Sequence, residues 1–119
     1  MANPNIVNVT TIYGNTAVQS VTTSATAIVT NSAASGKVYK INNLMVTNTD
    51  TANVATITVD LYRSSTAYKM SSNVSINAST TYTPIDKTLS LYLLEGDAIR
   101  LTANANSMLT AVCSWEEIN

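Results

Sequence analysis

Apolar and polar residues alternate with a period of two along much of this chain, which is the pattern of half-buried β-strands. The clearest example spans residues 54–63. Its two faces hold, respectively, Ile57, Val59 and Leu61, and Thr56, Thr58 and Asp60. This pattern predicts a strand with one face in a protein core and the other toward solvent.

Residues 37–48 are also predicted to form a strand, but their alternation breaks around Asn42 and Asn43. Two structures would explain the break: a β-bulge, which inserts one extra residue into a strand, or a strand that crosses between two sheets. We favour the bulge.

Residues 89–101 are predicted to contain two strands separated by a tight turn. Leucines alternate with polar residues before the turn, and Ile99 and Leu101 resume the alternation after it. The turn itself contains Gly96, which adopts a positive φ at no steric cost. We expect an antiparallel hairpin here.

The last segment, residues 108–118, is predicted to be a strand with Trp115 as a core anchor. Its apolar face holds Leu109, Ala111, Cys113 and Trp115. Weaker strand patterns occupy residues 6–13, 17–21, 25–30, 68–76 and 80–85, separated by turn signals such as Gly14, Ser64-Ser65 and Pro84.

Eight to ten short strands and no sustained helical pattern predict an all-β fold. The length of 119 residues suits a single domain. Many short strands with frequent turns favour a two-sheet antiparallel sandwich, of jelly-roll or immunoglobulin-like topology. The sandwich is expected to span residues 11–119, with residues 1–10 forming either an N-terminal docking arm or a first strand.

Composition narrows the function classes. Charged residues make up 11% of the chain and the net charge is −1, whereas Ser, Thr and Asn supply 13, 19 and 14 residues. Nucleic-acid binding requires clustered Lys and Arg, which are absent. No apolar run of about 18 residues could span a bilayer, and no secretion signal precedes the first strand. We expect a soluble protein that is made and used without export and binds neither nucleic acid nor membrane.

Catalytic chemistry has few candidate residues. The chain has no histidine, which removes the Ser-His-Asp and Cys-His arrangements and the commonest zinc sites. Cys113 is predicted to be a small buried side chain rather than a nucleophile. The close carboxylate pairs are Glu95 with Asp97, which flank a turn, and Glu116 with Glu117, which a strand points to opposite faces. We expect no enzyme, no catalytic residue, no cofactor and no metal.

The tyrosines leave one binding hypothesis open. Exposed aromatic rings could line a sugar-binding groove, although each ring also suits a strand position where it packs and its hydroxyl reaches water. The six residues are Tyr13, Tyr39, Tyr62, Tyr68, Tyr82 and Tyr92.

Four segments resemble small β-rich virion proteins of tailed bacteriophages, especially those that infect marine cyanobacteria. They are NPNIVNVT (residues 3–10), SGKVYKI (35–41), LYLLEGDAIRL (91–101) and SWEEI (114–118). The resemblance implies a structural protein without enzymatic activity, either a capsid decoration (cement) protein or a component of the neck, tail or fibre.

A decoration protein is the leading hypothesis. It would assemble in the host cytoplasm, bind the exterior of the capsid as a homotrimer, and bridge subunits of the major capsid protein. A neck, tail or fibre adaptor would bind neck or tail proteins instead and would be present in far fewer copies per particle. A receptor-binding or glycan-binding module is a further alternative.

The N-terminal segment is the expected docking site. Its apolar residues could add as a strand to the exposed sheet edge of a neighbouring molecule, whereas Pro4 would block pairing at the start. If the segment instead forms an ordinary first strand, it belongs to the sandwich; in both cases Ile6 is expected to be buried. The candidate interface residues are Asn3, Pro4, Asn5, Ile6, Val7 and Val9.

Overall fold

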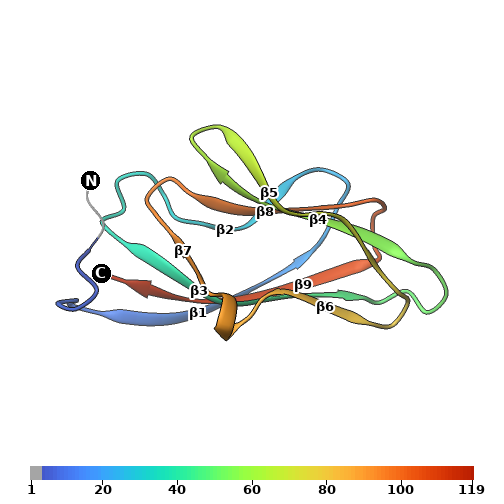
Figure 1. Cartoon of the computed structure of the whole chain (residues 1–119), viewed down its shortest axis with the longest axis horizontal. Helices are drawn as coiled ribbons and strands as arrows, with labels where there is room; N and C mark the ends of the chain where they lie inside the picture. The colour runs from blue at the N-terminus through green and yellow to red at the C-terminus, as the bar shows by residue number, and fades with distance from the viewer. Residues whose placement is uncertain (1–3) are drawn as a thin grey trace.

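Two antiparallel β-sheets pack face to face in the computed structural model, which describes residues 4–119 (Figure 1). The all-β, single-domain sandwich predicted from the sequence is confirmed. The elements are β1 (Ile12–Ser20), β2 (Thr26–Thr30), β3 (Val38–Asn48), β4 (Ala55–Arg63), β5 (Thr66–Ile76), β6 (Thr81–Ile85), the short 3-10 helix η1 (Lys87–Leu89), β7 (Leu91–Leu93), β8 (Ala98–Ala103) and β9 (Leu109–Ile118).

The strand order is that of a jelly-roll. The first sheet has the order β1-β9-β3, and both β6 and β7 pair with the free side of β3. The second sheet has the order β2-β8-β4-β5. When β6 and β7 are counted as one interrupted strand, the eight strands form two four-stranded sheets. The chain passes repeatedly from one sheet to the other, as in a jelly-roll. The immunoglobulin-like alternative, with sheets ABED and CFG, does not fit this order.

Alternate residues of both sheets form the core between them. Ile57 and Val59 on β4 are fully buried, as the period-two pattern predicts, and so are Ile99 and Leu101 on β8. On the facing sheet, Leu109, Ala111 and Cys113 of β9 point inward and are at most 1% exposed. Trp115 follows on the same face, but it packs against the core from its margin, where its ring stacks on Tyr39 with centroids 6.2 Å apart.

The predicted bulge in β3 is confirmed. Its register against β9 shifts between Ile41, which lies opposite Trp115, and Asn43, which lies opposite Ser114. The extra residue, Asn42, shifts the alternation, so residues with odd numbers before the bulge and residues with even numbers after it face the core. For this reason Ile41 and Leu44 are both fully buried although they are three positions apart.

The predicted turn at Gly96 is present, but the predicted hairpin is wrong. Gly96 has φ +87°, and the Asp97 N–H donates to the Leu94 carbonyl at 3.0 Å. The strands on either side do not pair: β7 belongs to the first sheet and β8 to the second. The turn therefore carries the chain from one sheet to the other. As a result, Leu93 of β7 and Ile99 of β8 enter the core from opposite sides, and both are fully buried.

The prediction of a strand over residues 6–13 is also wrong. Residues 6–8 form a turn and bend, and the first strand starts at Ile12 and continues to Ser20 without interruption. Ile6, expected to be buried, is 51% exposed. The alternation of apolar residues near the N-terminus was too short to distinguish a strand from a turn that carries apolar side chains.

A two-residue turn joins β4 to β5. Arg63 lies opposite Thr66, and the two residues between them, Ser64 and Ser65, have φ values of 51° and 61°. Positive φ at both central positions defines a type I′ turn, which matches the twist of the flanking strands and favours Asn-Gly. Serine has a β-carbon that makes this left-handed conformation unfavourable.

This strain predicts a stabilising substitution. The double change Ser64→Asn with Ser65→Gly is expected to raise the free energy of unfolding by about 1 kcal/mol and the melting temperature by about 4 °C. Thermal and urea denaturation measure both quantities. A matched control is Ser75→Gly in the exposed part of β5, where glycine is expected to lower stability by a similar amount. A fall in melting temperature for the turn variant would contradict the account.

Candidate functional site

The predicted interface segment lies at one end of the sandwich. Asn3 is outside the described residues. Pro4, Asn5, Ile6, Val7 and Val9 precede β1, beside the start of β3 and the end of β9, at the left of Figure 1.

The segment is folded rather than extended. The Asn5 carbonyl accepts a hydrogen bond from the Asn8 N–H at 3.0 Å, and the Asn5 side chain accepts one from the Val7 N–H at 3.0 Å. Thr11 exchanges two backbone hydrogen bonds with Asn119, of 3.1 and 2.9 Å. These last bonds fix the point at which the segment leaves the body of the protein.

A groove of about 300 Å³ lies where the segment meets the sandwich. Its lining residues are Pro4, Ile6, Val38, Tyr92 and Leu94. Val38 is 3% exposed although it is not part of the main core, and its cross-strand neighbour Ile118 is 5% exposed. The N-terminal segment therefore contributes to a small second apolar cluster on the outside of the first sheet.

Several apolar side chains near the N-terminus remain exposed. Ile6 is 51% and Val7 is 90% exposed, and on the adjoining strand β1 the figures are 54% for Ile12 and 62% for Tyr13. Exposed apolar residues that gather in one part of a surface mark an interaction site. The sequence identified Ile6 and Val7 as interface candidates, but it did not identify the groove residues Val38, Tyr92 and Leu94, because only the register of β3 and β7 brings them together.

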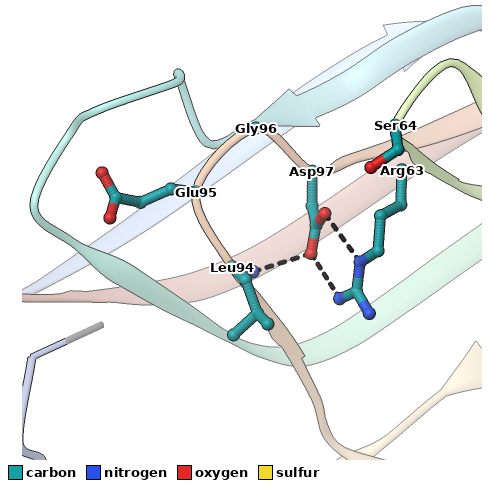
Figure 2. Close-up of a pocket in the computed structure, with 6 residues that line it drawn as sticks. All are labelled: Arg63, Ser64, Leu94, Glu95, Gly96 and Asp97. Atoms are coloured by element: carbon teal, nitrogen blue, oxygen red, sulfur yellow. Dashed lines mark hydrogen bonds and ion pairs between the residues drawn. The ribbon is translucent and has the colours of Figure 1, made fainter. Parts of the chain in front are cut away.

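The carboxylates of Glu95 and Asp97 do not form a shared site. Figure 2 shows them on opposite sides of the turn that contains Gly96. Glu95 accepts a hydrogen bond from the Gly36 N–H at 3.0 Å. Asp97, only 2% exposed, receives two hydrogen bonds from the Arg63 guanidinium, of 2.9 and 2.5 Å, and a third from the Leu94 N–H at 2.8 Å.

These contacts give Asp97 a structural role. Its charge is balanced by Arg63 at the end of β4, so the ion pair joins the β7–β8 turn to the second sheet. The groove of about 330 Å³ beside it is lined by Arg63, Ser64 and residues 94–97. Three hydrogen bonds from Arg63 and Leu94 use most of the accepting capacity of this carboxylate within the fold.

The second carboxylate pair also separates. Glu117 accepts a hydrogen bond from the Asn15 side chain at 2.8 Å and forms an ion pair with Lys37 at 3.2 Å. Glu116 accepts from the Asn42 side chain at 3.1 Å. The two side chains contact different partners, as expected for consecutive residues of a strand.

The tyrosines do not gather in one groove. Tyr39 stacks on Trp115, and the Arg100 guanidinium lies 4.0 Å above the ring of Tyr62. The Tyr82 hydroxyl is hydrogen-bonded to Ser71 at 2.8 Å. The exposed rings of Tyr13, Tyr68 and Tyr92 are on β1, β5 and β7, respectively. β5 belongs to the second sheet, and β1 and β7 lie at opposite edges of the first sheet.

Residues 4–119 have neither a metal-binding cluster nor a membrane-spanning helix. This part of the chain contains no cluster of three or more His, Cys, Asp or Glu side chains with the geometry to hold a metal ion. It also contains no helix of sufficient length and apolar character to cross a membrane.

Comparison with known proteins adds no relative. No protein-family model matches the chain, and no curated protein shows significant similarity to it. The arrangement of its own residues is therefore the basis for assigning a function.

The buried carboxylate of Asp97, paired with the half-exposed Arg63, predicts a large stability effect. Asp97→Ala leaves the Arg63 guanidinium and the Leu94 N–H without their acceptor and is expected to lower the free energy of unfolding by about 3 kcal/mol. Lys37→Met removes an ion pair whose carboxylate is less buried, since the Glu117 side chain is 20% exposed and the Asp97 side chain 3%, and is expected to cost less than about 1 kcal/mol. Urea denaturation compares the two variants. Equal losses would show that Asp97 is not a structural anchor.

The burial of the Cys113 thiol allows a prediction about its reactivity. Burial raises its pKa from 9.0 to about 12, so the folded protein holds the thiol protonated at pH 8. A thiol reagent is expected to label Cys113 at that pH only after denaturation. Because the unfolded thiol ionises first, this group's contribution to stability is complete below pH 9 and decreases as the pH rises toward 12. Rapid labelling of the folded protein at pH 8 would contradict this assignment.

Proposed function

We propose that this chain is a structural protein of a bacteriophage particle and that it decorates the outside of the capsid. Its partners would be further copies of itself and the major capsid protein. The observation that carries the proposal is a jelly-roll with exposed apolar residues at its N-terminal end, Ile6 and Val7 above all, and with its close carboxylate pairs separated.

The fold is compatible with this role without deciding it. Jelly-rolls occur in viral capsid proteins, but also in lectins and cupins, so the surface has to supply the argument. Here the surface is rich in Ser, Thr and Asn, and charged residues are 11% of the chain. A weakly charged polar surface allows many identical copies to lie close together without strong mutual repulsion.

The mechanism would be additive. Each decoration protein would make several modest contacts, on the order of 1,000 Å² apiece, with neighbouring capsid subunits. The repeated lattice multiplies these contacts, since a molecule released at one contact is held near the shell by the others. Subunits bridged in this way resist the internal pressure of packaged DNA.

The N-terminal segment supplies the docking contact in this proposal. Within its part that the structure describes, no backbone hydrogen bond connects residues 4–9 to the sandwich. Ile6 and Val7 are exposed, so a partner could bury them without first unfolding the domain. The same surface would serve an adaptor in the neck, tail or fibre; that alternative predicts tens of copies per particle or fewer, whereas a decoration protein is expected in hundreds.

Substitution of Val7 tests the docking role. Val7→Ser is expected to leave the free energy of unfolding within about 0.5 kcal/mol of the parent value, since the side chain is 90% exposed. It is expected to lower the occupancy of purified, expanded capsids about tenfold at subsaturating protein, because the contact is repeated over the lattice.

The matched control is Leu89→Ser, which removes an apolar side chain that is 63% exposed on η1. This variant is expected to bind capsids like the parent chain. Unchanged occupancy for Val7→Ser, or equal losses for both variants, would remove the docking role of the N-terminal segment.

A further inference from the structure

Three of the four sheet edges carry features that prevent pairing with another chain. The edge strand β2 has only five residues and a register shift between Ala27 and Val29. The edge strand β5 carries Lys69 and two register shifts, and its Asn73 has φ 48°. The edge formed by β6 and β7 contains Pro84 and is interrupted by η1. Short strands, bulges, prolines and lysines are the devices by which proteins protect exposed edges.

The fourth edge, β1, has none of these devices. Its nine residues contain no charge and no proline, and its register with β9 continues from Ile12 to Ser20 without a shift. β1 is the edge strand of the first sheet and pairs with β9 along one side only, so its other side has no neighbouring strand (Figure 1). A long, regular, uncharged edge is a template for another strand.

The hydrogen bonds at the start of β1 identify which backbone groups are available. Thr11 and Asn119 each donate an N–H to the other's carbonyl, so they form a hydrogen-bonded pair. In an antiparallel ladder such pairs recur at every second residue. Odd-numbered residues of β1 therefore bond to β9. The N–H and C=O groups that point away from the sheet belong to Ile12, Gly14, Thr16, Val18 and Ser20.

We propose that β1 pairs with β1 of a second copy, antiparallel and about a two-fold axis at Thr16. In this register every residue with outward-pointing backbone groups meets another such residue. Thr16 faces its own copy, Gly14 faces Val18, and Ile12 faces Ser20. The pairing would form about ten backbone hydrogen bonds and join the two first sheets into one continuous sheet.

The side chains of β1 favour a second copy as the partner. A charged residue on the two-fold axis would face its own copy, which is unfavourable, and β1 has no charged residue at the axis or elsewhere. Val18 is 74% exposed, and the residue opposite it would be Gly14, beside which a β-carbon would meet nothing within 4 Å. The exposed Val18 side chain can therefore cover the glycine without a clash.

This inference deepens the proposed function, because it identifies the contact between copies, and it concerns the purified chain alone. It predicts a dimer or another even-numbered assembly, in contrast to the homotrimer expected from the sequence. Binding to capsids is not needed to test it, so failure of the pairing and failure of the decoration role give different results.

Hydrogen exchange detects the pairing directly. In the assembled protein, the amides of the even-numbered residues 12–20 are expected to exchange at least about tenfold more slowly than in a monomeric variant. The amides of the odd-numbered residues are protected by β9 in both states and serve as an internal control. Fast exchange at the even-numbered positions of the assembled protein would overturn the proposal.

A charge exchange at Thr16 tests the two-fold axis. Thr16→Lys and Thr16→Glu each place like charges opposite each other and are expected to weaken self-association about tenfold or more. An equimolar mixture is expected to restore it, as measured by analytical ultracentrifugation. The control is Thr110→Lys, which places the same charge at an exposed position on β9, a strand that lies between β1 and β3. This variant is expected to associate like the parent chain.

Circular dichroism and melting temperature establish that each variant is folded. A parent chain that forms trimers, or a Thr16→Lys variant that associates as tightly as the parent, would contradict pairing through β1. Loss of association after deletion of residues 2–10, with Thr16→Lys unaffected, would also contradict it and would assign the contact to the N-terminal segment.

Discussion

The apolar layer between the two sheets is the interaction on which the rest of this structure depends. A single cysteine leaves no disulfide within the chain, and residues 4–119 form three ion pairs with one another. Burial of alternate residues on β3, β4, β8 and β9 must therefore provide most of the stability. Two of the ion pairs support that layer at the second sheet: Arg63 holds Asp97 in the β7–β8 turn, and Arg100 holds Asp60 on the neighbouring strand at 3.0 Å.

The requirement to keep this layer apolar explains which features could be predicted from the sequence. Period two is imposed wherever one face of a strand is buried, so β4 and β9 were predictable. The break at Asn42 favoured a bulge over a strand crossing, and the bulge keeps both Ile41 and Leu44 inside. The turn at Gly96 was predictable from local chemistry. Its role in crossing between sheets was not, because β7 and β8 have the same pattern whether they pair with each other or with strands far away in the sequence.

The candidate site was less predictable for the same reason. Local sequence identified Ile6 and Val7 as apolar residues of a terminal segment. The turn that Asn5 closes is held by local hydrogen bonds, whereas the groove shared with Val38 depends on contacts with β3 and β7. The ion pair between Arg63 and Asp97 also joins residues far apart in the chain. The availability of β1 as an edge follows from strand order, which the alternation pattern does not contain.

The proposed role in assembly rests on a few features of the fold and its surface. A core that needs few charges leaves a polar, weakly charged exterior, one unprotected edge at β1, and exposed apolar residues at the N-terminal end. Image reconstruction of intact phage particles from a lysate that contains this chain tests the proposed decoration role most directly. The account predicts density for the jelly-roll in hundreds of copies on the outer capsid surface. Particles that lack the protein altogether, or that carry it only inside the shell, would contradict the account.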